Sequence, residues 1–258
     1  KWVLTAAHCM VDTTGNLVPP QDTLVLAGIH DLRYPDSGYI TRSVVRVLTH
    51  YYYQHSGGFP NDIALLELDS PIPLGQTQAG IAVSTVTVDP ANVGAGQSVK
   101  AIGWGSTVYC HWSDWNPCLE YRDRLQEVSL NTISNSSCTD RMDTPATDRQ
   151  VCTAMSANLG VLWGDSGGPL LRLGQDGIYR QVGIMSTIDY MPNGVFNWNP
   201  DAAKYTRVAS YTTWINSAIN SGAVGGRVLN ELGQLVANAD VKLTPDDFRP
   251  LAAATSSG

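Results

Sequence analysis

Three short segments of the sequence contain residue types that together could activate a serine hydroxyl. They are Leu-Thr-Ala-Ala-His-Cys with His8, Asn-Asp-Ile-Ala-Leu-Leu-Glu-Leu with Asp62, and Gly-Asp-Ser-Gly-Gly-Pro with Ser166. A serine hydroxyl is a weak nucleophile at neutral pH, so it needs a base within hydrogen-bonding reach and a carboxylate that orients the base. Histidine suits this task because its unperturbed pKa is about 6.5. The set therefore predicts acyl transfer through a covalent intermediate.

The elements around these residues are expected to be strands. Short apolar-rich runs separated by turn residues are typical of all-β proteins. The predicted strands are Trp2–Thr5, Thr23–Ala27, Ser43–Leu48, Ile63–Leu68, Ser98–Ile102, Leu125–Leu130, Gln150–Thr153, Pro169–Leu173, Tyr179–Ser186 and Ala203–Arg207. A convincing helical period occurs only between Tyr211 and Ile219. Each of the three segments therefore borders a predicted strand.

The composition limits the classes of function. A chain of 258 residues can form a two-layer or two-barrel β protein with a substantial core. Its net charge of −7 argues against nucleic acid binding, which requires basic surface stripes. The sequence contains no apolar run of about 18 residues, the length that spans a bilayer. We therefore expect neither a nucleic acid nor a membrane as partner.

Taken singly, the three segments have ordinary explanations. His8 could be a surface or core histidine, Asp62 a turn residue, and the glycines around Ser166 part of a tight turn. In the order His, Asp, Ser on an all-β pattern, the segments resemble the trypsin/chymotrypsin family of serine endopeptidases. Gly103–Gly105 (Gly-Trp-Gly) and Val182–Ser186 (Val-Gly-Ile-Met-Ser) match further family motifs, so that the resemblance covers roughly residues 1–221. It implies an all-β fold of two six-stranded antiparallel barrels with a C-terminal helix.

The same resemblance implies a role for each site residue. His8 would be the base, Asp62 its orienting carboxylate and Ser166 the nucleophile, in a cleft between the barrels. The backbone N–H groups of Gly164 and Ser166 would form the oxyanion hole, and Ser186 would lie against Asp62. The residues expected to line the substrate pocket are Gly160, Val161, Ser186, Ile188 and Ala203.

The pocket residues depart from the trypsin-like pattern. Trypsin-like members carry an aspartate six residues before the nucleophile, where this chain has Gly160, so cleavage after Lys or Arg is disfavoured. Ile188 stands where enzymes with deep pockets have glycine, and a branched side chain there should favour small aliphatic P1 residues. Asp189, near the expected pocket mouth, offers an alternative in which a basic group is attracted. Phe59 could line the neighbouring subsite or rest on the surface as a loop aromatic.

The five cysteines point to a secreted protein. Cys110 with Cys118 and Cys138 with Cys152 are two close local pairs, and the family resemblance supports the second. Cys110, His111, Asp114 and Cys118 could also be metal ligands, but zinc needs four ordered donors, so a local disulfide is favoured. We therefore predict no metal and no cofactor. Cys9 is left without a partner.

The start of the chain is also expected to be unusual. The resemblance makes Lys1–Met10 the third strand of the first barrel, so this barrel is predicted to be incomplete, with the partner of Cys9 on a preceding strand. In the family, an N-terminal ammonium freed by zymogen cleavage pairs with the aspartate before the nucleophile, Asp165 here. Lys1 cannot serve, because it is tied into the strand beside His8. We therefore expect the 258-residue chain alone to be poorly folded or weakly active.

Beyond Ser221 the character of the sequence changes. Residues 222–226 (Gly-Ala-Val-Gly-Gly) read as a flexible joint, and residues 227–244 contain two short β-like runs. These runs resemble the opening hairpin of the small β-sandwich modules that follow secreted bacterial hydrolases. The predicted organisation is a protease domain over residues 1–221, then residues 222–258 as a linker with the start of an accessory module or a disordered tail.

The resemblance thus predicts a secreted, monomeric serine endopeptidase. Its expected partners are protein or peptide substrates and protein inhibitors. A non-catalytic homologue that binds partners through the cleft is the main alternative, although such proteins usually lose a residue of the triad. An esterase of the α/β-hydrolase type fits poorly, because its catalytic residues follow the order Ser, acid, His on alternating strands and helices.

Overall fold

The computed structural model describes residues 1–33, 38–55, 58–76, 81–108, 120–142, 144–156, 159–188, 201–220, 240–241 and 254–255. The chain divides into two compact units, residues 1–223 and 224–258. In the second unit the described residues form one antiparallel pair, β14 (Asp240–Val241) with β15 (Ala254–Thr255). Among the described helices, none has the length and apolar composition needed to cross a bilayer.

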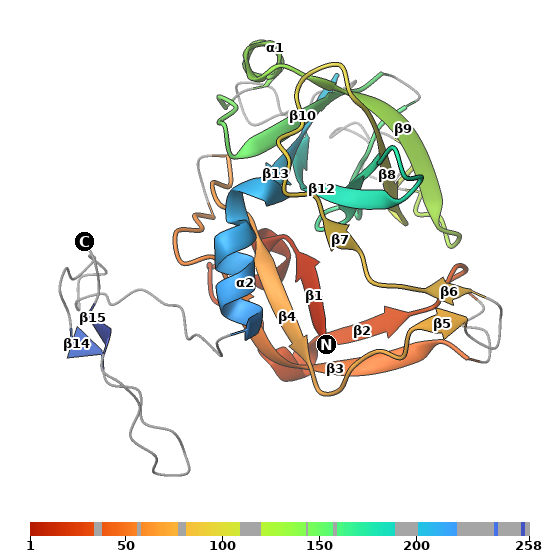
Figure 1. Ribbon diagram of the computed structural model, residues 1–258, viewed down its shortest axis with the longest axis vertical. Coiled ribbons are helices and arrows are strands. Elements are labelled where there is room, and N and C mark those ends of the chain that lie inside the picture. Colours follow the sequence, from red (N-terminus) through yellow and green to blue (C-terminus); the bar gives the residue numbers. More distant parts are fainter. Residues whose placement is uncertain are drawn as a thin grey trace. The chain divides into compact units, whose positions relative to one another are not determined.

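The N-terminal half of the first unit is an antiparallel sheet in the order β1-β4-β3-β2 (Figure 1). Its strands are β1 (Trp2–Thr5), β4 (Ala64–Leu68), β3 (Ile40–Thr49) and β2 (Leu24–Ala27). The two-residue strands β5 (Gly75–Gln76) and β6 (Ala82–Val83) form a separate pair. Apolar side chains of β3 and β4 form the core of this half together with the short helix η1 (Ala7–Met10). Strand β1 leads directly into η1, which contains His8.

The C-terminal half is a closed antiparallel barrel of six strands, in the order β11-β8-β9-β10-β13-β12, with β11 paired back to β12. The strands are β8 (Ser98–Gly103), β9 (Gln126–Ile133), β10 (Gln150–Ala154), β11 (Pro169–Leu173), β12 (Tyr179–Ile188) and β13 (Ala202–Arg207). A short strand, β7 (Thr87–Val88), pairs with β12 in parallel. The predicted all-β, chymotrypsin-like fold is confirmed, with one closed barrel and one half-barrel sheet.

The described part of the first unit contains four helical segments besides η1. They are η2 (Pro20–Asp22), α1 (Asn135–Arg141), η3 (Val208–Tyr211) and α2 (Thr212–Asn220). The predicted C-terminal helix is α2, whose Ile215 packs with Ala6 and Ile63 of the N-terminal half. Helix α1 was not predicted; its first turn is capped by Ser134, whose hydroxyl accepts the N–H of Ser137 at 3.1 Å.

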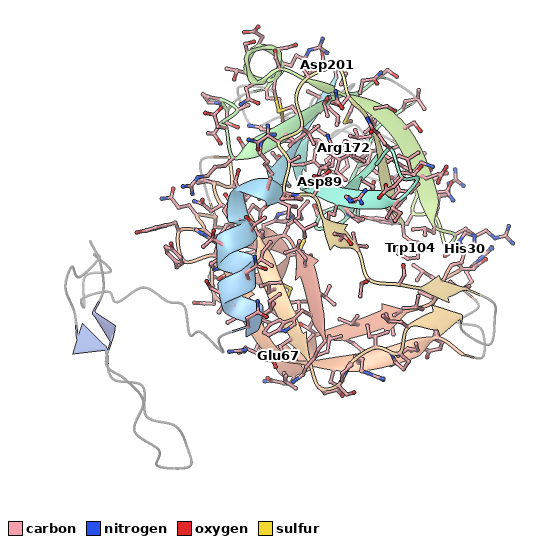
Figure 2. All side chains as sticks on the ribbon, viewed as in Figure 1. His30, Glu67, Asp89, Trp104, Arg172 and Asp201 are labelled. Carbon is pink, nitrogen blue, oxygen red and sulfur yellow. A yellow bond between two sulfur atoms is a disulfide. The ribbon has the colours of Figure 1, made fainter. Side chains whose placement is uncertain are left out.

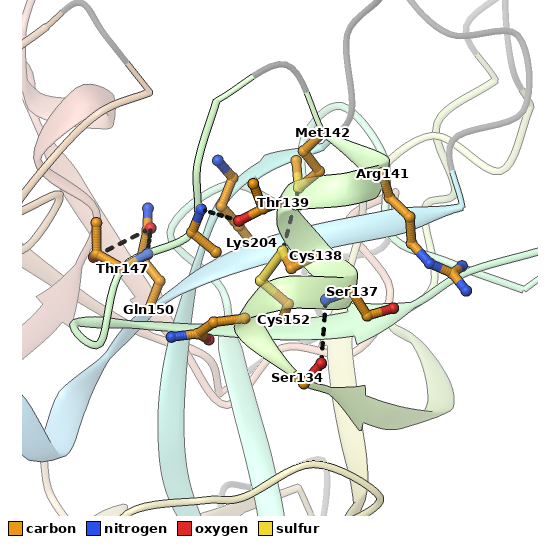
Figure 3. Close-up of a disulfide and its surroundings, with 12 residues drawn as sticks. Ser134, Ser137, Cys138, Thr139, Arg141, Met142, Thr147, Gln150, Cys152 and Lys204 are labelled. Atoms are coloured by element: carbon orange, nitrogen blue, oxygen red, sulfur yellow. Dashed lines mark hydrogen bonds between the residues drawn. A yellow bond between two sulfur atoms is a disulfide. The ribbon is translucent and has the colours of Figure 1, made fainter.

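The predicted disulfide between Cys138 and Cys152 joins α1 to β10 (Figure 3). Both cysteines are fully buried in a small apolar cluster that also contains Met142 and Ala202. The other predicted pair, Cys110 with Cys118, lies outside the described residues.

Contacts between the two halves fix their relative position. The indole N–H of Trp104, in the C-terminal half, donates to the carbonyl of His30 in the N-terminal half at 3.2 Å, and the two residues lie together in Figure 2. Next to them, Arg124 binds Asp31 at 3.0 Å. Helix α2 adds the apolar contacts described above. The two sheets that carry the candidate site residues are therefore joined by polar contacts at the surface and by apolar contacts of α2.

Candidate active site

His8 and Asp62 are brought together by the pairing of β1 with β4, because His8 follows the end of β1 and Asp62 precedes the start of β4. Nδ1 of His8 lies 2.7 Å from Oδ2 of Asp62, and the backbone N–H of His8 donates to Oδ1 of the same carboxylate at 2.8 Å. The carboxylate therefore contacts both the ring and the main chain of His8, which fixes the orientation of the imidazole. Its other ring nitrogen, Nε2, remains for contact with a second group.

Asp62 is fully buried and is held by two further hydroxyl groups. The hydroxyl of Ser186 donates to Oδ2 at 2.6 Å, as expected from the sequence, and that of Thr206 donates to the backbone carbonyl of Asp62 at 2.6 Å. Ser186 lies at a register shift in β12, between Met185 and Thr187. Such bulges re-aim side chains next to functional sites. The carboxylate itself has three polar contacts, to the ring and backbone N–H of His8 and to the Ser186 hydroxyl, as a buried carboxylate requires because desolvation without partners is costly.

The surroundings change the proton affinity of His8. Burial lowers the pKa of its imidazole, but the hydrogen bond and charge of Asp62, together with Cys9, outweigh burial and raise the pKa to about 10. The side chain of His8 is 18% exposed to solvent. Sγ of Cys9 lies 3.6 Å from Nε2, the ring nitrogen that does not face Asp62. Cys9 is a free, exposed thiol in the structure.

Ser166 is exposed in a tight loop between Leu162 and Pro169. Gly164 and Gly167 have φ values of +94° and +78°, which side chains other than glycine rarely adopt. A Cβ at Gly167 would collide with Oγ1 of Thr5 and would lie 3.3 Å from Sγ of Cys9. The loop therefore packs against the segment that carries His8, and it needs glycine to do so.

The amide groups of this loop face in different directions. Within the described part of the chain, the backbone N–H groups of Gly164 and Ser166 have no hydrogen-bond acceptor. Those of Gly167 and Gly168, by contrast, donate to the carbonyls of Met185 and Asp165 at 2.9 Å. Two neighbouring unpaired N–H groups form a site that can accept a negatively charged oxygen.

The carboxylate of Asp165 does not contact Ser166 but stabilises the loop through two backbone hydrogen bonds. Its carboxylate accepts the N–H of Gly105 at 2.9 Å and that of Leu162 at 3.0 Å. Burial raises the pKa of Asp165, against the opposite effect of these two hydrogen bonds. The carboxylate borders a cavity of about 270 Å³. Among the described residues it has no cationic partner.

A family model described as trypsin matches residues 1–215 of this sequence. The chain belongs to the trypsin family. Serine protease SP24D of Anopheles gambiae is 30% identical over 220 residues, which are 85% of this chain and 69% of the relative. Brachyurin of Leptuca pugilator is 31% identical over 217 residues, 84% of this chain and 83% of the relative. Serine protease filzig of Drosophila melanogaster is 31% identical over 228 residues, 84% of this chain but 12% of the relative.

This trypsin-family protein is therefore a serine-type endopeptidase, and proteins are its substrates. Its expected pocket residues lie in the barrel of the C-terminal half. Ile188 of β12 pairs with Ala203 of β13, and both belong to one buried cluster with Val161. Gly160 precedes Val161 in the loop before Ser166. Asp189, the alternative pocket residue, lies outside the described residues.

Two residues near the site of this trypsin-family protein, Tyr121 and Thr206, were not identified from the sequence. The ring of Tyr121 stands over Gly164, because a Cβ at that glycine would lie 3.0 Å from Cε1 of the tyrosine. Thr206 supports Asp62, as described above. Neither residue belongs to a recognisable motif, so no sequence signal marks them.

Phe59 could not be assigned from the sequence, and the structure now places it beside His8. The two ring centroids are 5.5 Å apart, and Phe59 has a φ of +53°. A non-glycine residue in this region is strained, and such strain is concentrated at functional sites. The position beside His8 favours the subsite interpretation over that of a surface aromatic.

Proposed function

We propose that this protein hydrolyses peptide bonds through an acyl-enzyme intermediate, with His8, Asp62 and Ser166 as a catalytic triad. The observation that carries the proposal is the fully buried Asp62, which contacts both the ring and the backbone N–H of His8 and also accepts the hydroxyl of Ser186. A structural ion pair would not need this arrangement of one carboxylate around one imidazole.

The chemistry follows from the positions of the groups. Nε2 of His8 would take the proton of the Ser166 hydroxyl as its oxygen attacks the substrate carbonyl. Asp62 would stabilise the imidazolium that forms. The N–H groups of Gly164 and Ser166 would bind the negative oxygen of the tetrahedral intermediate, an effect of about 10²–10³ in rate for each donor. His8 would then return the proton to the leaving amine, and water would release the acyl group by the same steps in reverse order.

For specificity, we propose cleavage after small aliphatic P1 residues. Gly160 brings no charge to the pocket. Ile188 is buried together with Ala203 and Val161, so the wall of the pocket is apolar and the pocket itself is narrow. A peptide library cleaved mainly after Phe, Tyr, Lys or Arg would contradict this part of the proposal.

We also propose that the protein acts outside the cell. The Cys138–Cys152 disulfide supports this localisation, because structural disulfides persist in oxidising compartments. Detection of the mature protein in the medium of the producing cells, rather than in their lysate, would test this.

Covalent labelling of the full chain by a fluorophosphonate probe tests the catalytic proposal. Labelling is expected for the natural sequence, at the low rate of a weakly active chain, and no labelling is expected for Ser166→Ala. Ser98→Ala, which changes an exposed serine on β8, is the matched control and should label normally. Failure of a correctly folded protein to label would favour the non-catalytic homologue over an enzyme.

A further inference from the structure

We propose that the side chain of Met155 forms the floor of the P1 pocket and limits the size of the P1 residue. The inference rests on the proposed function, because it assumes that Gly160 and its neighbours receive the P1 side chain. It adds a specificity-determining residue that no motif in the sequence identifies.

The space that a side chain at position 160 would occupy is filled by Met155. A Cβ built on Gly160 would lie 2.6 Å from Cε of Met155 and 3.3 Å from both its Cγ and its Sδ. No carbon can be added at that distance without displacing the thioether. The pocket position that lacks a side chain of its own is therefore covered by the side chain of Met155, which stands shortly before it in the sequence.

Met155 is held in place by a backbone hydrogen bond and by packing in the core. It follows directly on β10, and its N–H donates at 2.7 Å to the carbonyl of Asp201, the residue before β13. Only 7% of its surface is exposed, and it belongs to the same buried cluster as Val161, Ile188 and Ala203. The proposed floor and the proposed walls thus pack as one apolar unit.

The chemistry of a thioether explains which P1 groups would be accepted. Met155 brings no charge and no strong hydrogen-bonding group, so it cannot compensate the ammonium of a lysine or the guanidinium of an arginine. Its unbranched side chain can adapt to a methyl or isopropyl group, but it shortens the pocket against Leu, Phe and longer residues. The floor therefore acts together with Ile188, which narrows the pocket from the side.

A series of peptides that differ only at P1, with Ala, Val, Leu, Phe or Arg, tests the role of Met155. In Met155→Ala, the ratio of kcat/KM for Leu to that for Ala is expected to rise about tenfold or more, since each methylene in such a pocket changes rates by about 10–200-fold. Met142→Ala is the matched control: Met142 is similarly buried, but it packs against Cys138 in a different cluster. Its P1 profile should stay unchanged.

The comparison uses ratios within one preparation, so it does not depend on how much of a variant folds. If Met155→Ala yields no active protein, Met155→Leu keeps the volume of the floor, and Met155→Phe enlarges it. Met155→Phe is then expected to reduce cleavage after Val relative to Ala, whereas Met155→Leu should leave that ratio nearly unchanged. Equal P1 profiles for all active variants would overturn the inference.

A charge placed at position 160 provides an independent test. In Gly160→Asp alone, Met155 occupies the place of the new carboxylate, so no gain of cleavage after Arg is expected. In the double variant with Met155→Ala, the carboxylate has room, and the Arg-to-Ala ratio of kcat/KM should rise above that of either single variant. An equal rise in Gly160→Asp alone would show that Met155 does not occupy the floor.

Failure of this inference is distinguishable from failure of the proposed function. If the natural sequence does not label with the fluorophosphonate probe, the catalytic proposal itself fails. If it labels and cleaves peptides, but the P1 profile is insensitive to Met155, only the inference about the pocket floor is overturned.

Discussion

The thiol of Cys9 lies 3.6 Å from Nε2 of His8, on the side of the imidazole that does not face Asp62. This is the nitrogen that must take the proton of Ser166 in the proposed mechanism. Cys9 contributes to the raised pKa of His8, since a sulfur acceptor stabilises the imidazolium more than the neutral ring. A neighbouring thiol thus acts directly on the proposed general base.

The first prediction concerns the pH dependence of activity. The base must be neutral, so kcat/KM should rise as pH increases through the raised pKa of His8. In the form of the protein in which Cys9 is a free thiol, as it is in the structure, Cys9 favours the protonated form of His8, so Cys9→Ala should lower this pKa and move the acid limb of the profile to lower pH. The measurement is the pH profile of kcat/KM, or of the labelling rate, for both proteins. An acid limb that stays in place would mean that Cys9 does not act on His8.

The second prediction concerns the carboxylate. Asp62→Asn keeps the size of the side chain, but its amide would donate to Nδ1 and so place the ring proton on Nε2, the wrong tautomer for a base at Nε2, and it cannot stabilise the imidazolium. The value of kcat is expected to fall by about 10⁴-fold. Thr206→Val, which removes the hydroxyl that binds only the backbone carbonyl of Asp62, should cost far less activity. Comparable losses in the two variants would argue against a special role of the carboxylate.

Most of the fold could be predicted because the strands carry a local signal. The apolar runs of β1, β4 and β11 are short and bounded by turn residues, and their predicted bounds lie close to those observed. Strands β3 and β12 extend beyond the predicted ranges, to Ile40–Thr49 and Tyr179–Ile188. Their ends are defined by pairing with neighbouring strands, which a single sequence does not show.

The features missed from the sequence depend on tertiary contacts. Helix α1 contains Asn-Ser-Ser-Cys-Thr-Asp-Arg, which has no apolar period, and it is held by the cap at Ser134 and the disulfide at Cys138. Tyr121 approaches Gly164 from a segment distant in the sequence, and Met155 approaches Gly160 from the stretch just before it, which belongs to no motif. Glycine in the sequence shows that space is needed, but it does not show which side chain fills that space.

The third prediction concerns the cavity next to Asp165. A carboxylate with a pKa raised by burial should bind a cation that reaches it, and the family resemblance implies an N-terminal ammonium as this cation. An aliphatic dipeptide with a free amino group, added at millimolar concentration, should increase the rate of labelling at Ser166. The N-acetylated dipeptide and the variant Asp165→Asn are the controls, and neither should show the increase. Equal stimulation by both dipeptides would exclude an ammonium–carboxylate pair.

The last prediction concerns the disulfide, whose role is expected to be in stability rather than in chemistry. Cys138 and Cys152 are 14 residues apart, and a loop of this length contributes about 3 kcal/mol by restricting the unfolded chain. The double variant Cys138→Ala/Cys152→Ala should lose stability of this order in urea unfolding. Ser134→Ala, which removes only the cap of α1, should lose about 1 kcal/mol.

Active-site titration should give the same kcat per folded molecule in both variants, because the disulfide lies in a different cluster from the pocket walls. A fall in kcat at full folding would instead couple α1 to the pocket through Ala202, which packs with the disulfide and precedes Ala203 in β13.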